Sequence, residues 1–406
     1  MLELVKPAPP DAILGLTQAF VEDPRPDKIN LGVGVYKDEQ GSTPVLRAVK
    51  AAEARLLETD HSKSYFPIDG RPELGRHARA MLFGPDHPTA DLVDSPRAFS
   101  AQTPGGTGGL RVAGDFIKAN LPGSTVHLSD PTWANHHGIF QAAGLETQTY
   151  PYLDRLANAL AFDAMLSGLE TAKPGDVVLL HACCHNPTGI DPTLEQWQQI
   201  AQLLAEKQLF PLIDFAYQGF GEGLDQDAAG LHAVAAACPE FMVTASYSKN
   251  FGLYRERIGA LTVVAADESA AAAAKSQVKQ AIRRNYSNPP AHGGAVVQTI
   301  LDDPQLTADW KAELATMRDR INSIRQAFRD RLDDADIQLS PEGNAFITRQ
   351  NGMFTLSGLS KDCVEKLRED HAIYIVGSGR INVAGMTPDN LPKLCDAIGA
   401  VVHACA

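Results

Sequence analysis

Residues 241–259 read FMVTASYSKNFGLYRERIG, a short apolar run followed by one amine and two guanidinium groups. The run at residues 241–245 is typical of a buried strand, and Lys249 follows it closely, with Arg255 and Arg257 next. Ligands of open α/β sheets bind outside the carboxyl ends of the strands. An amine held there near other cations has a lowered pKa and can attack a carbonyl to form a Schiff base. A single loop lysine is more often a surface group, so the rest of the chain must decide between the two interpretations.

Outward from this strand, short apolar runs alternate with amphipathic segments. The predicted strands cover residues 125–129, 146–150, 177–180, 210–213, 241–245 and 258–264. The predicted helices cover residues 45–58, 110–119, 135–143, 162–170 and 194–207, with further helix signals up to Leu82 and at residues 270–274. Alternation of this kind predicts an α/β fold with a mostly parallel sheet covered by helices.

The pattern changes after Pro304. Residues 308–332 predict one long helix, because their apolar side chains recur at a helical period. Further elements are predicted as short strands at residues 29–36, 346–347, 353–354, 373–376 and 380–383 and as helices at residues 12–21 and from about residue 389. We therefore expect a large domain at residues 48–310 and a smaller α+β domain made of residues 1–47 and 311–406.

The composition limits the classes of function. Of the 406 residues, 44% are hydrophobic and 21% are charged, which is ordinary for a globular protein. The net charge of −13 argues against nucleic acid or an anionic membrane surface as a main partner. No apolar run approaches the length that spans a membrane, and no secretory signal is visible. The six scattered cysteines suggest no disulfide framework, so we expect a cytoplasmic location.

Residues 210–217, FPLIDFAY, place Asp214 at the end of a predicted buried strand. Such an aspartate often caps a helix or makes a turn. It could instead hold a cation, for example a protonated pyridine nitrogen. Tyr217 follows three residues later and can point the same way.

Residues 181–189 read HACCHNPTG, the densest cluster of side chains that could bind a metal. Adjacent Cys183 and Cys184 cannot easily chelate together, and no second ligand pair follows, so we expect no metal site. We expect these side chains to line the floor of a pocket, with Asn186 presenting its amide. The peptide bond before Pro187 is a candidate cis bond.

Anion-binding groups occur at several places. Residues 102–111, QTPGGTGGLR, predict a glycine-rich turn that leads into a helix, and helix N-termini bind phosphate. No lysine follows the glycines, so this is not a Walker motif. Arg257, Arg283 and Arg380 carry the forked donors that suit carboxylate and phosphate. Arg380 lies beside an apolar strand and would otherwise be an unpaired buried charge.

The order of these motifs resembles the class I aminotransferases, most of all the aspartate enzymes of bacteria and next the aromatic ones. The motifs that carry the resemblance are Gly105-Gly106-Thr107, Trp133, HACCHNPTG, DFAYQ, SYSKNFGLYRERIG, RRNYSNPPAHG and SGRINVAGM. The resemblance covers nearly the whole chain, and the motifs are highly specific in combination. It implies the fold type I architecture, pyridoxal 5'-phosphate (PLP) as cofactor, and a homodimer with active sites shared between subunits.

The resemblance also implies a reaction, PLP-dependent transamination between L-aspartate or L-glutamate and 2-oxoglutarate or oxaloacetate. An aromatic amino acid aminotransferase with dual aspartate/aromatic specificity stays open, because RRN at residues 283–285 suits either group. Ala134 stands where the family usually has proline, and Ala182 where it usually has glycine. Neither departure removes a catalytic group.

The resemblance assigns the chemistry near the cofactor ring to five residues. Lys249 resembles the lysine that bonds the cofactor and moves the proton. Asp214 looks like the partner of the pyridine nitrogen, with His136 behind it. Tyr217 and Asn186 look like donors to the phenolic oxygen of the cofactor.

The remaining site residues would hold the phosphate, the ring face and the substrate. The phosphate group would be held by Gly105, Gly106, Thr107, Ser246 and Arg257, with Tyr65 of a second subunit. The substrate would contact Gly34, Trp133, which stacks on the cofactor, Asn186, Arg380 at its α-carboxylate and Arg283 of a second subunit at its side-chain carboxylate. Arg255 has no counterpart in the family.

Overall fold

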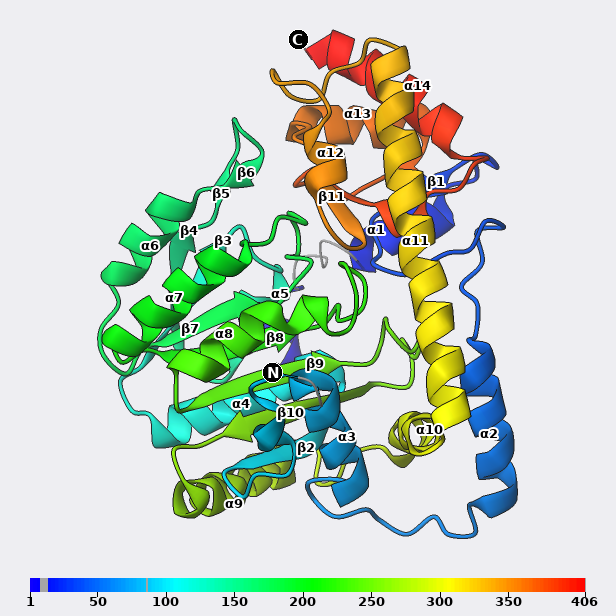
Figure 1. Ribbon diagram of the computed structural model, residues 1–406. Coiled ribbons are helices and arrows are strands. Elements are labelled where there is room, and N and C mark those ends of the chain that lie inside the picture. The colour runs from blue at the N-terminus through cyan, green and yellow to red at the C-terminus, as the bar shows by residue number, and fades with distance from the viewer. Residues whose placement is uncertain (8–13, 85–86, 406) are drawn as a thin grey trace.

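A seven-stranded sheet forms the centre of the computed structural model, which describes residues 1–7, 14–84 and 87–405 (Figure 1). Across the sheet the strands are β2 (Ala98–Pro104), β10 (Ile258–Val264), β9 (Phe241–Ser246), β8 (Phe210–Phe215), β7 (Val177–His181), β3 (Thr125–Asp130) and β4 (Glu146–Pro151). Strand β10 runs antiparallel to both of its neighbours, and the other pairs are parallel. The predicted mostly parallel sheet is therefore confirmed.

The central strands are apolar because both faces of the sheet are covered. Every residue of β7, β9 and β10 is buried. Since side chains alternate along a strand, Leu212 packs into one apolar core and its neighbour Ile213 into the other. This burial on both faces produces the continuous apolar runs seen in the sequence.

Two sets of helices cover the two faces (Figure 1). One core contains side chains of α4 (Gly105–Asn120), α5 (Asn135–Ala142) and α9 (Glu268–Asn285). The other core contains side chains of α3 (Pro72–Phe83), α6 (Phe162–Glu170), α7 (Leu194–Glu206), α8 (Ala229–Ala237) and α10 (Ala291–Asp302). A short antiparallel pair, β5 (Leu153–Asp154) and β6 (Ala159–Leu160), follows β4.

The long helix α11 (Pro304–Asp334) joins the sheet region to a smaller group of elements. Its first half packs against α2 (Arg47–Thr59) and α10, and its second half against α12 (Phe346–Arg349) and α14 (Leu391–Cys405), as Figure 1 shows. The smaller group also contains α1 (Leu14–Glu22), α13 (Lys361–His371), the parallel pair β1 (Ile29–Asn30) and β12 (Ile373–Tyr374), and the antiparallel pair β11 (Phe354–Leu356) and β13 (Arg380–Asn382). The predicted boundary at residue 310 falls inside α11, and the domain division stays a prediction.

Some predicted elements are wrong or incomplete. The strand predicted at residues 346–347 is the helix α12, since Ile347 donates its N–H to the carbonyl of Asn344, three residues earlier. The glycines at residues 105–109 do not form a turn before a helix, because α4 already begins at Gly105. Only residues 29–30 of the strand predicted at residues 29–36 pair as a strand. The first residues of the helix predicted at 12–21 lie outside the described part of the chain.

Among the described residues, three α-helices and three strands have no counterpart in the sequence prediction, namely α8, α10 and α13, and β2, β5 and β6. Within the residues that the structure describes, none of the helices is both long enough and apolar enough to cross a lipid bilayer.

Candidate active site

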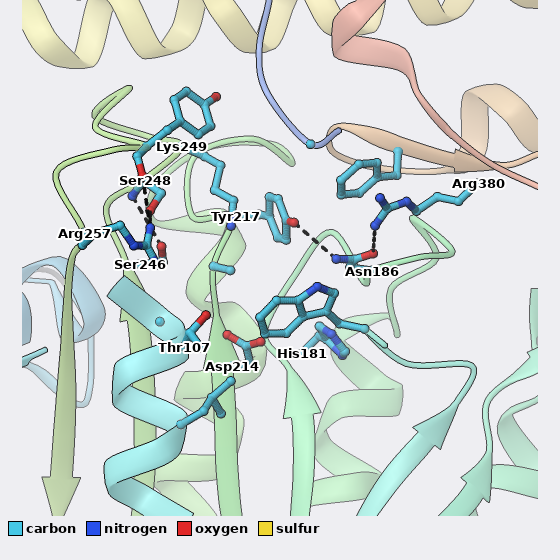
Figure 2. Close-up of a pocket in the computed structure, with 17 residues that line it drawn as sticks. Thr107, His181, Asn186, Asp214, Tyr217, Ser246, Ser248, Lys249, Arg257 and Arg380 are labelled. Atoms are coloured by element: carbon cyan, nitrogen blue, oxygen red, sulfur yellow. Dashed lines mark hydrogen bonds between the residues drawn. The ribbon is translucent and has the colours of Figure 1, made fainter. Parts of the chain in front are cut away.

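A cavity lies at the carboxyl ends of β7, β8 and β9, between the sheet and the β11–β13 pair (Figure 2). His181 ends β7 and lies directly opposite Asp214 of β8. Ser246 ends β9, and Gly106 and Thr107 come from the first turn of α4. The site therefore lies where the topology of an open α/β sheet predicts a ligand.

Lys249 projects into this cavity from the loop that joins β9 to β10. Its Nζ lies 4.5 Å from the centre of the Tyr217 ring. Burial lowers the pKa of Lys249 to about 8, and the charges of Arg257 and Arg380 add to this effect while Asp214 opposes it. At pH 7 roughly one amine in ten is then neutral. This is the direction that the neighbouring cations predicted.

The Lys249 loop is held in place by contacts with α11. The ring of Phe251 stacks on Trp310 with 4.2 Å between ring centres. Trp310 Nε1 also donates to the carbonyl of Asn250 at 2.7 Å. The two residues that follow the lysine are thus fixed against α11.

Asp214 is buried, and its carboxylate is hydrogen-bonded to the ring of His136. His136 Nε2 lies 3.0 Å from Asp214 Oδ2, and His136 Nδ1 lies 2.8 Å from the hydroxyl of Thr132. Burial alone would raise the pKa of Asp214, but the hydrogen bond and charge of His136, with His181 and Lys249, bring it below its ordinary value. Because the carboxylate is ionised, His136 donates to it from Nε2. Asp214 Oδ1 has no hydrogen-bond partner among the described residues.

His181 is a site residue that the sequence analysis placed only generally, on a pocket floor. Its ring lies 5.2 Å from that of His136 and 4.3 Å from that of His185. Both ring nitrogens are buried without a hydrogen-bond partner in the described chain. Burial, with His136 nearby, lowers the pKa of His181 to about 3 although Asp214 opposes the shift. His181 is therefore neutral, and its position at a strand end beside Asp214 was the signal that could have identified it.

Arg380 forms the opposite wall of the cavity, as Figure 2 shows. It is 4% exposed, and its guanidinium donates to Asn186 Oδ1 at 2.9 Å and to the carbonyl of Gly32 at 2.8 Å. Its Cζ lies 4.1 Å from the centre of the Phe354 ring. No carboxylate pairs with it among the described residues, and its Nε has no partner there. Burial lowers the pKa of this guanidinium, which stays charged.

Asn186 links the two walls. Its Nδ2 lies 3.4 Å from the hydroxyl of Tyr217, while its Oδ1 accepts from Arg380. The Asn186–Pro187 bond is cis, as the sequence suggested. A second cis bond, Asp130–Pro131, precedes Trp133 and was not predicted.

Glycines bring the N-terminus of α4 close to a cation. Gly105 has φ +70°, and a Cβ there would lie 2.6 Å from Arg257 Nη2. A Cβ on Gly106 would lie 3.3 Å from the Cβ of Ser246. Pro104 gives the helix no side-chain cap, so the first backbone N–H groups of α4 remain available. A helix N-terminus beside a guanidinium and a serine fits a phosphate group.

Two groups of side chains lie close enough to hold a metal ion within the described chain: His136, His181 and Asp214, and Cys183, Cys184 and Asp227. In the first group, both ring nitrogens of His136 are already engaged. In the second, the Asp227 carboxylate accepts four backbone N–H groups. The absence of a resident metal stays a prediction.

The other predicted residues divide between those at the cavity and those outside it. Gly34 and Trp133 line the cavity, together with Ser248, Tyr254 and Phe354, which the sequence analysis did not select. Tyr65 is 90% exposed and does not line the cavity. Arg283 is also exposed, and its Nη1 contacts the hydroxyl of Ser287. Within one chain these two side chains therefore do not reach the site.

Known proteins resemble this chain over its full length. The sequence model of the family described as aminotransferase class I and II matches residues 26–398. The aspartate aminotransferase of Escherichia coli (strain K12) is 55% identical over 402 residues, covering 99% of this chain and 100% of that protein. The aromatic-amino-acid aminotransferase of Pseudomonas aeruginosa is 48% identical over 393 residues, covering 97% of each. The crystal structure of the aromatic-amino-acid aminotransferase of Burkholderia pseudomallei, covalently bound to pyridoxal phosphate, matches with a TM-score of 0.94 at 45% identity and 99% coverage of both chains. The chain therefore belongs to the class I and II aminotransferases.

Proposed function

We propose that this chain catalyses transamination between L-aspartate or L-glutamate and 2-oxoglutarate or oxaloacetate, with PLP as cofactor. The observation that carries the proposal is Arg380, a buried guanidinium without a carboxylate partner in the described chain, on the same cavity as Lys249 and Asp214. A fixed cation for a carboxylate, an amine with a lowered pKa and a buried ionised carboxylate are the three groups that amino-acid chemistry on PLP requires. The family membership and the aspartate aminotransferases among the relatives support it.

The residues at the cavity fit PLP. Gly106, Thr107, Ser246 and Arg257 would hold its phosphate, since they combine a helix N-terminus with a hydroxyl and a cation. Asp214 Oδ1, which lacks a partner in the described chain, would accept from the ring nitrogen. When bound, PLP supplies an electron sink that stabilises negative charge at the substrate's Cα.

Asp214 and His136 would act together to keep the pyridine nitrogen of the cofactor protonated. The ionised carboxylate favours a protonated partner at Oδ1. His136 fixes the carboxylate through Oδ2 and is itself fixed by Thr132. Trp133 lies edge-on to His136, with 5.2 Å between the rings, and would lie along the face of the cofactor.

Lys249 holds and moves protons at the reacting carbon. Its Nζ, neutral in part, would take the proton from the substrate's Cα–H as general base and return a proton as general acid. Tyr217 and Asn186 would donate to the phenolic oxygen. Burial raises the pKa of Tyr217, so its hydroxyl stays protonated and can donate a hydrogen bond.

Arg380 orients the substrate. Two guanidinium donors already bind Asn186 and Gly32, so the plane of the fork is fixed before a substrate enters. Binding the α-carboxylate in this plane would hold the Cα–H bond toward Lys249, which lowers the entropic part of the barrier. Gly34 would close over the substrate, because its lack of a Cβ leaves room beside Phe354.

A homodimer would complete the site. Arg283 of a second subunit would bind the side-chain carboxylate, and Tyr65 of that subunit would bind the phosphate. Both side chains are exposed in a single chain. The large apolar side chains Met1, Leu2, Leu4 and Leu57 are also each more than 80% exposed, which supports an interface between copies.

The two-domain division belongs to the same proposal. Residues 48–310 would form the large domain that binds the cofactor, and residues 1–47 and 311–406 the small domain that carries Arg380. The hydrogen bond from the N–H of Tyr36 to the hydroxyl of Tyr254 connects the two across the cavity. A cytoplasmic location stays a prediction.

A second candidate is dual aspartate/aromatic specificity. Besides Tyr217, the aromatic side chains Trp133, Tyr254 and Phe354 line the cavity and would contact an aromatic substrate. Aromatic-amino-acid aminotransferases are also among the similar proteins. The ratio of kcat/KM for L-aspartate to kcat/KM for L-phenylalanine distinguishes the two candidates.

The test is a substrate panel on the purified chain loaded with PLP. We expect turnover of L-aspartate with 2-oxoglutarate, and a change in the visible absorbance of the cofactor when L-aspartate is added alone. A ratio of kcat/KM near one would favour dual specificity. Loaded enzyme that turns over neither amino acid would refute both candidates.

A further inference from the structure

Arg325 is a buried cation without an acid partner. It lies on α11 within the apolar stripe that contains Ile321, Ile324 and Phe328, and it is 2% exposed. No carboxylate pairs with it in the described part of the chain, and its Nε has no hydrogen-bond partner there. Burying a charge without a counter-charge costs free energy, and an apolar side chain at such a place is often as stable or more so. Stability alone therefore does not explain an arginine here.

The guanidinium binds three backbone carbonyls of one short segment. Arg325 Nη1 donates to Ile347 at 3.0 Å, and Nη2 donates to Gly352 at 2.7 Å and to Phe354 at 2.9 Å. These carbonyls belong to the segment that leads from α12 into β11. Three charge-assisted hydrogen bonds from one rigid fork fix the path of that segment.

The segment in turn sets the position of Arg380. The Phe354 ring is 3% exposed and covers the Arg380 guanidinium at 4.1 Å. It meets Tyr217 edge-on at 6.0 Å, and a Cβ on Gly34 would lie 2.6 Å from its Cζ. The ring is therefore confined from three sides, and its backbone is held from behind by Arg325.

The same segment touches the turn that carries Asn186, which accepts a hydrogen bond from Arg380. The Asn351 N–H donates to the carbonyl of Gly189 at 2.6 Å, and the Asn351 side chain lies 3.3 Å from Asp191 Oδ2. Asp191 also accepts the N–H groups of Cys184 and His185. A shift of the segment would thus move two of the groups that contact the Arg380 guanidinium, the Phe354 ring and Asn186.

We infer that Arg325 is a positioning residue for substrate binding: through the segment at residues 347–354 it holds the Phe354 ring and the Asn186 turn, and so fixes the Arg380 fork for the α-carboxylate. This inference rests on the proposed function. It predicts that loss of Arg325 weakens binding of the α-carboxylate end of every substrate, while the cofactor side of the cavity is unaffected.

The test compares Arg325→Met with Arg331→Met, which removes an exposed arginine of α11 that pairs with Asp396 and makes no hydrogen bond or ion pair to the described residues 347–354. The probe is succinate, a dicarboxylate that cannot react, titrated into the PLP-loaded enzyme by calorimetry. We expect its Kd to rise about tenfold in Arg325→Met, a loss of one decade in affinity, and to stay unchanged in Arg331→Met. The KM values for L-aspartate and L-alanine should rise together, with kcat changed less than about twofold and PLP affinity unchanged. Arg325→Lys, which keeps the cation but not the fork, should restore part of the succinate affinity.

Unchanged succinate affinity in folded Arg325→Met, or an equal loss in Arg331→Met, would overturn the inference. If Arg325→Met does not fold, Phe354→Leu is the deciding variant. It keeps Arg325 and removes only the aromatic ring that contacts the Arg380 guanidinium. Unchanged succinate affinity in Phe354→Leu would then also overturn it. The proposed function fails separately, when the unmodified chain neither binds succinate nor turns over L-aspartate.

Discussion

On the sheet side of the cavity, Asp214 and Lys249 each influence the charge of the other, whereas on the opposite side Arg380 has only neutral partners. The strand ends thus hold groups whose protonation can change during a reaction. The β11–β13 side holds a permanent charge in a fixed orientation. The comparison suggests that chemistry belongs to the sheet side and recognition to the other, so substitutions on the two sides should affect kcat and KM differently.

The largest expected effect is on the sheet side. Lys249→Ala removes the amine that we propose moves the Cα proton, so we expect kcat to fall by more than about 10³-fold, with binding of PLP phosphate retained. Steady-state turnover of L-aspartate measures this. Lys275→Ala, which removes an exposed lysine paired with Asp69, is the control for loss of a positive charge. A Lys249→Ala enzyme within tenfold of the unmodified one would remove this residue from the mechanism.

Asp214→Asn should be the next most damaging change. The neutral amide cannot keep the ring nitrogen protonated, so we expect kcat to fall by about 10²-fold or more with KM little changed. Asp115→Asn, in a surface ion pair with Arg111, controls for loss of a carboxylate. If KM rose and kcat did not fall, the assignment of chemistry to the sheet side and of recognition to the β11–β13 side would be wrong.

On the recognition side, Arg283→Leu should reduce kcat/KM for L-aspartate by about 10²-fold, as expected for loss of a charged hydrogen bond, and affect L-phenylalanine much less. The neighbouring exposed Arg284→Leu serves as the control. Equal losses for both substrates would remove Arg283 as the residue that binds the side-chain carboxylate.

The same variant tests the shared site. Refolding Arg283→Leu together with inactive Lys249→Ala in equal amounts should restore about a quarter of the unmodified activity, because half the dimers are hybrids and each hybrid has one intact site. If mixing restores no more activity than Arg283→Leu alone contributes, both residues come from one chain.

The smallest expected effect is on the pH dependence of the reaction between Lys249 and PLP. Lys249 is reactive when neutral, and its pKa is lowered to about 8. The rate at which the apoenzyme regains the absorbance of bound PLP should therefore rise about tenfold per pH unit below that value and level off above it. A rate independent of pH between about 6.5 and 9 would contradict a lowered pKa at this amine.

The two sides also differ in how far the sequence predicts them. The strands β7, β8 and β9 are buried on both faces, so they form apolar runs, and the chemistry-bearing residues follow each run. Strand β2 was missed because polar side chains interrupt it. Inside the protein, the hydroxyls of Ser100 and Thr262 are hydrogen-bonded at 2.8 Å, and the Gln102 side chain donates to the carbonyl of Pro290.

The recognition side was less predictable because its geometry depends on contacts between distant segments. Arg380 was found from its local surroundings, but Phe354 and Arg325 were not. The two apolar residues at 346–347 suggested a strand, yet they begin α12. Arg325 binds the carbonyl of Ile347 in this helix, and the loop that follows the helix packs on Gly189. A charged residue inside the apolar stripe of α11 was the one signal in the sequence that marked Arg325 as unusual.

The most direct test of the central claim is a single turnover without a second keto acid. PLP-loaded enzyme is mixed with excess L-aspartate, and oxaloacetate is measured together with the visible spectrum of the cofactor. The account predicts a complete spectral change and about one oxaloacetate per chain, since the amino group stays on the cofactor. An unchanged spectrum with no oxaloacetate, from enzyme that retains PLP, would contradict it.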